Sequence, residues 1–104
     1  MSPDETIKRL VETLILPKYP ELKLVNVDSW SVTSYRTYNV RFMVKKKLPS
    51  ELQQEIDTEV KTLFKMASLD EREQGRYEKN VIMVWFKTPR EKHYTFSSEI
   101  GYNH

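Results

Sequence analysis

Apolar residues recur at helical spacing near the start of the chain and again in its middle. The first set, spaced by three and four positions, is Ile7, Leu10, Val11, Leu14 and Ile15. The segment 2–5 before it, Ser-Pro-Asp-Glu, is a typical helix start, because serine caps well and proline suits the first helical position. A similar start at 50–53, with Ser50 as the expected cap, precedes a second apolar stripe from Leu52 to Ala67. The pattern therefore predicts two amphipathic helices.

Four segments have the pattern of β-strands. Residues 22–32 form the first, with a bulge expected near Asp28 and Ser29, and residues 38–45 alternate apolar and polar side chains most cleanly. Residues 81–86 are apolar at every position, and residues 93–97 form a short edge strand. Successive side chains of a strand point to opposite faces, so segment 81–86 presents large apolar groups on both of its faces.

The order of these elements is α-β-β-α-β-β. Two amphipathic helices cover one face of a four-stranded sheet, so we expect an α+β fold: a two-layer sandwich with both helices on one face of a mainly antiparallel sheet. A chain of 104 residues lacks the material for a second core. We assign residues 1–97 to a single domain and residues 98–104 to a C-terminal tail.

The sheet face that the helices leave open is the main candidate site. If Tyr38 and its alternating neighbours face the helices, Arg41 and Met43 face away from them. Segment 81–86 adds either Val81, Met83 and Trp85 or the other three residues, and the sequence leaves this choice open. The candidate interface residues are Trp30, Arg41, Met43, Met83 and Trp85, with Ile100 and Tyr102 in the tail.

Three covers for such an apolar face are compatible with the sequence. The tail of the chain itself is one, through Tyr94, Phe96, Ile100 or Tyr102. A protein partner or a second copy is another, and nucleic acid stacked on the aromatic rings is the third. Interface cores are enriched in aromatic residues, Met and Arg. We therefore expect a small protein–protein interaction subunit of a larger assembly, such as a virion or a multi-subunit complex.

The alternative is an RNA- or DNA-binding module that uses the same face. Its candidate residues are Arg36, Arg41, Lys45, Lys46 and Lys47, of which the three lysines form the only basic run. Neither a GxxG clamp nor an RNP-like motif accompanies them. Charge is unevenly distributed, because residues 1–47 have an excess of Lys and Arg and residues 48–80 an excess of Asp and Glu. This asymmetry favours charge-complementary assembly.

The sequence offers little for catalysis, metals or cofactors. It contains no cysteine and two glycines, which argues against thiol chemistry and glycine-rich phosphate loops. His93 and His104 lack metal-ligand spacing. We therefore expect no enzyme activity, catalytic residue, metal, cofactor or small-molecule substrate. No segment has the length of a membrane span, and the acidic start differs from a secretory signal, so we expect a protein of the cytoplasm or of a complex or virion made there.

Overall fold

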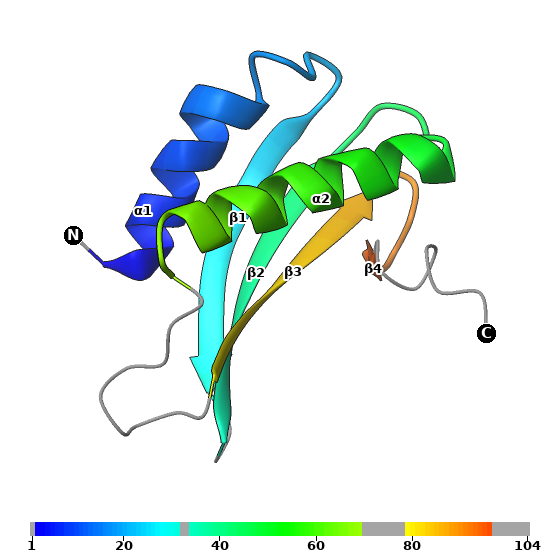
Figure 1. Cartoon of the computed structure of the whole chain (residues 1–104). Coiled ribbons are helices and arrows are strands. Elements are labelled where there is room, and N and C mark those ends of the chain that lie inside the picture. Colours follow the sequence, from blue (N-terminus) through cyan, green and yellow to red (C-terminus); the bar gives the residue numbers. More distant parts are fainter. Residues whose placement is uncertain (1, 32–33, 70–78, 97–104) are drawn as a thin grey trace.

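The computed structural model describes residues 2–31, 34–69 and 79–96. Within them it has two α-helices and a four-stranded mixed sheet, which confirms the α+β class (Figure 1). The elements are α1 (Pro3–Leu10), the π-helical segment η1 (Val11–Ile15), β1 (Lys23–Ser31), β2 (Tyr35–Met43), α2 (Ser50–Met66), β3 (Lys79–Lys87) and β4 (Thr95–Phe96). The predicted tail, residues 98–104, lies outside the described residues.

The first helix begins where the sequence predicts. The Ser2 hydroxyl accepts a hydrogen bond from the Glu5 backbone N–H at 3.2 Å, which satisfies one of the free donors of the first turn. The helix then continues as the π-helical segment η1, closed by a bond from Leu16 N–H to Val11 C=O. In this segment Val11 and Ile15 remain buried.

The predicted cap of α2 is wrong. Pro49, not Ser50, is the N-cap, and no side chain makes a capping hydrogen bond. The Gln53 side chain donates to the Leu48 carbonyl at 2.8 Å, just before the first turn of the helix. At the other end Ser68 has φ 57°, and the bond from Leu69 N–H to Phe64 C=O closes a Schellman-type turn.

The sheet has the order β1-β2-β3-β4. The pairs β1–β2 and β3–β4 are antiparallel, but β2 and β3 are parallel, so the prediction of a mainly antiparallel sheet gives way to a mixed one. The connection through α2 is long enough to return the chain to the start of β2, and such a crossover is what parallel pairing requires. The uninterrupted apolar run of β3 is typical of parallel strands.

The bulge in β1 lies elsewhere than expected. The pairing register shifts between Leu24 and Asn26, whereas Asp28 and Ser29 pair regularly with β2. The shift leaves Val25 out of the register and 44 % exposed. An inserted residue inverts the alternation after it, so both Leu24 and Val27 pack against the core.

The core lies between the helices and one face of the sheet (Figure 1). The ring of Phe64 on α2 packs against the ring of Tyr38 with a centroid distance of 5.6 Å. The rings of Phe42 and Phe86 stack with a centroid distance of 5.7 Å. The buried apolar residues of the sheet are Tyr38, Val40, Phe42, Ile82, Val84 and Phe86. The core face of β3 is therefore the 82/84/86 face, and Val81, Met83 and Trp85 point away from the helices.

Candidate functional site

The outer face of the sheet is the face turned away from α1 and α2. Cross-strand pairing places its side chains in rows across β1, β2 and β3. The rows are Trp30–Thr37–Val81, Asp28–Asn39–Met83, Asn26–Arg41–Trp85 and Lys23–Met43–Lys87. All five predicted interface residues in the described part of the chain, Trp30, Arg41, Met43, Met83 and Trp85, thus share this face.

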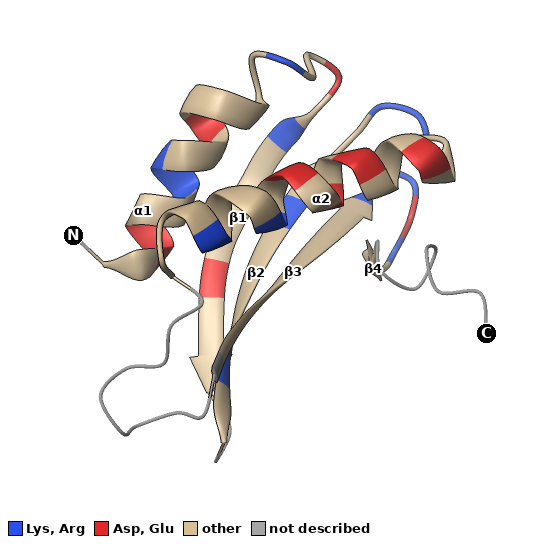
Figure 2. Cartoon of the chain, in the orientation of Figure 1, with Lys and Arg blue, Asp and Glu red and all other residues tan. Residues whose placement is uncertain are grey.

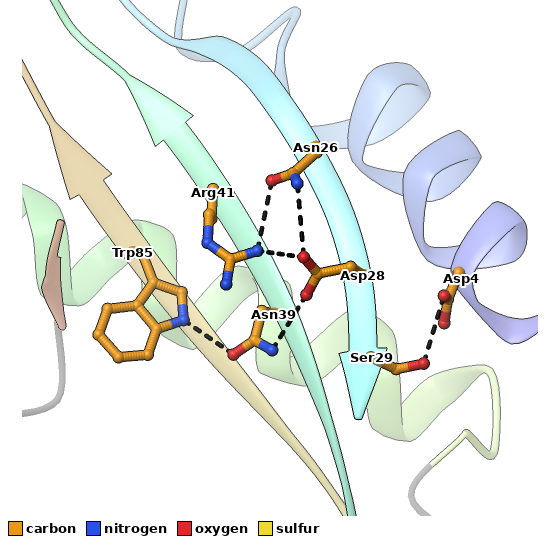
Figure 3. A network of polar contacts seen from close by, with 7 residues as sticks. All are labelled: Asp4, Asn26, Asp28, Ser29, Asn39, Arg41 and Trp85. Atoms are coloured by element: carbon orange, nitrogen blue, oxygen red, sulfur yellow. Dashed lines mark hydrogen bonds and ion pairs between the residues drawn. The ribbon is translucent and has the colours of Figure 1, made fainter. Parts of the chain in front are cut away.

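A polar network runs across the centre of the outer face (Figure 3). The Trp85 indole N–H donates to the Asn39 side-chain oxygen at 3.0 Å, and the Asn39 amide donates to Asp28 at 3.1 Å. Arg41 donates to the other oxygen of Asp28 at 2.6 Å and to Asn26 at 3.4 Å. The network therefore ties the three long strands together on the side opposite the helices.

This network modifies the expectation of an apolar patch beside Arg41 and Lys45. The row between those of Trp30 and Trp85 contains Asp28 and Asn39 as well as Met83, and Asn39 is only 1 % exposed. Trp85 is half-buried, because the ring of Phe96 lies against it with a centroid distance of 5.0 Å. The chain itself therefore supplies part of the cover, through one of the residues named for that role.

Trp30 is the most exposed aromatic residue of the outer face. It retains 52 % of its accessible surface, and Val81 and Met83, which lie one row apart on β3, are half-buried. Neither described helix lies over them, because both pack on the core face. Trp30 on β1 and the partly exposed Val81 and Met83 on β3, with Thr37 of β2 between Trp30 and Val81, are together called the apolar strip beside the polar network.

One end of the outer face is basic. Lys23 and Lys87 flank Met43 there. The Arg41 guanidinium and the Lys87 ammonium each lie 5.9 Å from the ring centre of Tyr94, within the range of cation–π attraction. The Tyr94 ring is therefore already engaged by two cations.

A basic groove lies beyond this end of the sheet, between the β2–α2 and β3–β4 connections. It has a volume of about 610 Å³. Its lining residues are Lys45, Lys46, Lys47, Thr88, Arg90 and Glu91. Figure 2 shows the blue 45–47 loop next to the segment that follows β3. No described carboxylate forms an ion pair with the three lysines or with Arg90.

Glu91 is the single acidic residue of the basic groove. The Thr88 backbone N–H donates to its carboxylate at 2.9 Å. This bond, together with the positive charges of Lys47 and Lys87, holds the pKa of Glu91 below its usual range. The groove thus keeps one ionised carboxylate of its own at the edge of a cationic surface.

The residues predicted for nucleic acid are not brought together. Arg36 lies on the core side of β2, with its guanidinium 5.6 Å from the Tyr38 ring centre. It is separated from Lys45 by the length of the strand, roughly 30 Å at about 3.3 Å per residue. Arg41 is paired with Asp28. Only Lys45, Lys46 and Lys47 remain as one exposed cationic group.

A second polar cluster lies at the rim of the core, where the segment after η1 meets α2. The Tyr19 hydroxyl bonds Glu55 at 2.6 Å and also bonds Glu59, which in turn pairs with Lys18. Burial and then the two carboxylates raise the pKa of Tyr19 above its usual range. Burial also favours a raised pKa for Glu59, but the hydrogen bonds from Lys18 and Tyr19 outweigh it and lower that pKa.

Sequence reasoning missed several residues of the site. Asn26, Asp28 and Asn39 complete the network, and Thr88, Arg90 and Glu91 complete the basic groove. The alternation of β2 placed Asn39 on the outer face, but its partners follow from strand register, which the sequence did not define. The predicted residues Ile100 and Tyr102 lie outside the described residues.

Two features are not found among the described residues: a metal-ligand cluster and a membrane-spanning helix. In the ranges 2–31, 34–69 and 79–96, no group of three or more His, Asp or Glu side chains is arranged to hold a metal ion. No described helix is both long and apolar enough to cross a membrane. His93 lies exposed between β3 and β4.

No protein-family model, curated protein or solved structure matches this chain. The class defined by the structure is thus an α+β protein with a mixed sheet, and its function has to be argued from its own residues.

Proposed function

We propose that this protein is a small non-enzymatic subunit that binds another protein through the outer face of its sheet. In this proposal the domain is a two-layer sandwich, and its partner takes the place of a third layer. The observation that carries the proposal is the accessible strip of Trp30, Val81 and Met83 beside a hydrogen-bonded network, on the face that the described helices leave open.

The network favours binding because its polar groups already have partners. A buried polar group without a hydrogen bond costs about 1–3 kcal/mol, and Asn39, Asp28 and Trp85 would avoid this cost when a partner removes water. The bonds also hold the strip in one arrangement, which reduces the entropy lost on association. Trp and Arg are the residues that most often dominate binding energy.

The chemistry of the surface defines the kind of partner. The strip fits an apolar patch, and the basic end around Lys23 and Lys87 fits an acidic margin. We propose a larger assembly, such as a virion or a multi-subunit complex, as the setting for this contact. Ile100 and Tyr102 remain our proposed second anchor, and a cytoplasmic site of synthesis remains a prediction.

Nucleic acid is the second candidate, and the basic groove is the observation that favours it. The groove offers a cluster of exposed cations, but the neighbouring ring of Tyr94 is engaged by Arg41 and Lys87. Sequence-tolerant binding of single strands relies on free aromatic platforms. We therefore rank nucleic acid below a protein partner.

Site-specific photo-crosslinking tests the proposal. A photoreactive amino acid replaces Met83 on the outer face or, as the matched control, Gln54, which is exposed on α2. In cells that make the protein, we expect a protein adduct of defined mass from position 83 and none from position 54. The adduct should form again from the two purified proteins, and an adduct of twice the chain mass would identify a second copy.

Equal labelling from both positions would contradict the proposal. A nuclease-sensitive adduct from position 83 would indicate that the outer face binds nucleic acid, as in the alternative.

A further inference from the structure

We propose that the basic groove receives a short acidic segment, a run of Glu or Asp side chains, of the protein bound on the outer face. This inference rests on the proposed function and names the chemistry of the partner. It starts from a mismatch of charge: the groove is lined by four cationic side chains and one carboxylate, Glu91, and its cations make no ion pair with any described carboxylate.

The groove is chemically suited to bind carboxylates. Glu91 shows that an ionised carboxylate is favoured at its edge, since a backbone N–H and neighbouring ammonium groups stabilise the charged form. Lysine ammonium groups are mobile point charges on long stems. Three of them in sequence can follow carboxylates whose spacing varies, whereas a single fixed anion would need a more rigid arrangement.

The extent of the positive surface favours a peptide over a nucleic acid. A nucleic-acid strand follows a continuous cationic track along several nucleotides. Here Arg41 is neutralised by Asp28, and Arg36 lies on the other face of the sheet. The N-terminal half of α2, which begins just after the groove, is acidic (Figure 2). The cationic surface therefore ends at α2 on one side, and on the other side it continues only to Lys87 and Lys23 at the basic end of the outer face.

The position of the groove links it to the outer face. Lys87 is the last residue of β3, pairs across the sheet with Met43, and is followed directly by the groove residue Thr88. The Val44 N–H donates to the Lys87 carbonyl at 2.9 Å, which ties the two connections together at this end. One partner segment can therefore run from the outer face into the groove without crossing another element of the described chain.

The test uses the full chain, labelled with ¹⁵N, and two probes of matched charge. One is hexaglutamate, and the other is heptathymidylate, whose phosphates carry the same number of negative charges. At about 50 mM salt, where screening of surface charges is weak, we expect hexaglutamate to shift the backbone amide signals of residues 45–47 and of Thr88, Arg90 and Glu91. Heptathymidylate should bind several-fold more weakly.

Two charge-matched variants locate the effect. The triple change K45Q/K46Q/K47Q should weaken hexaglutamate binding roughly tenfold, as expected for the loss of three exposed ion pairs. The control K8Q/R9Q/K65Q removes the same charge from exposed positions on the helices and should leave the affinity nearly unchanged. All these side chains are exposed, so melting curves should show both variants folded.

Three outcomes would overturn the inference. They are the absence of amide shifts in the groove, an equal loss of affinity in both variants, and binding of heptathymidylate as tight as that of the peptide. The variant Trp30→Ala separates this inference from the proposed function, because it alters the outer face and leaves the groove intact. If position 83 gave no cross-linked adduct but hexaglutamate still bound, the proposed interface on the outer face would be wrong. The groove would then remain a site for acidic peptides.

Discussion

The two faces of the sheet are built by the same strands and obey different rules. On the core face, Ile82, Val84 and Phe86 of β3 are almost inaccessible and touch other apolar side chains. On the outer face, the most deeply buried groups are polar, with Thr37 and Asn39 at 2 % and 1 % exposure, while Trp30 is more than half exposed. The most deeply buried side chains of the sheet are thus apolar on the core face and polar on the outer face.

This difference shows how a mixed sheet with helices packed on its core face can keep its other face in order. The core face gains its stability from removing apolar surface from water, which needs the helices as a cover. The outer face is held by directional bonds among Asp28, Asn39, Arg41 and Trp85, which need no cover. Such a face is ordered before any partner arrives.

The largest expected effect comes from a change on the core face. Phe86→Ala should lower the free energy of unfolding by about 3–5 kcal/mol, because it removes a buried ring and leaves a cavity. Trp85→Ala, one position away on the outer face, should cost well under that, since the indole is half-buried and bonded to a single partner. Urea unfolding of both variants measures the difference.

Equal and large losses from the two variants would break the comparison. They would mean that the chain buries β3 on both sides by itself, and the proposed interface would lose its main support.

The next effect concerns the polar network. Asn39→Ala should cost about 1–3 kcal/mol, because it removes a buried amide and deprives Trp85 and Asp28 of a partner. Asn26→Ala is the matched control on the same face, since Asn26 is exposed and its two bonds are 3.4 Å long; it should cost no more than about 0.5 kcal/mol. Similar costs for both would show that the network does not hold the face together.

Much of the core face was predictable from the sequence, and little of the outer face was. The alternation of Tyr38, Val40 and Phe42 and the helical stripe through Ile56 and Phe64 are consequences of period alone, and both are buried as expected. Two predictions about the strands were wrong for different reasons. The uninterrupted apolar run of β3 is typical of a parallel strand but was not interpreted as one, whereas the position of the bulge in β1 depends on how the strands meet, which no local pattern encodes.

The network was hidden for the same reason. Asn39 and Asp28 are distant in sequence and become neighbours only through the register of β1 and β2. The groove was predictable only in part. The run of Lys45, Lys46 and Lys47 is evident in the sequence, whereas Arg90 lies beside it only because of the turn after β3. The sequence thus showed the local run of charge, but it did not show that the two connections bring these charges together.

A fall in pH should weaken the core face at its rim, where Glu59 bonds Lys18 and Tyr19. The pKa of Glu59 is lowered from 4.5 in the folded protein, so the unfolded chain takes up the proton first as the pH falls. The stabilisation from Glu59 is complete above its unfolded pKa and is lost as the pH falls through the lower folded value. Unfolding free energies between about pH 6 and pH 3 should therefore decline more steeply for the native protein than for Glu59→Gln.

The control for this pH series is Glu51→Gln, at an exposed position of the same helix. It should keep the steep decline. The free energy of unfolding of Glu59→Gln could instead decline as steeply as that of the native protein. The cluster of Lys18, Tyr19 and Glu59 would then contribute nothing to holding the segment after η1 against α2.

The smallest expected effect on folding is also the sharpest test of the outer face. Trp30 is 52 % exposed, so Trp30→Ala should change the free energy of unfolding by no more than about 1 kcal/mol, far below the cost of a buried ring. As an anchor, it should weaken association by roughly 2 kcal/mol, about thirtyfold, which sedimentation of the purified complex would measure. An intact complex would remove Trp30 from the interface. A large loss of monomer stability would instead assign Trp30 to the fold. A side chain that stabilises the monomer strongly has to be buried before any partner binds.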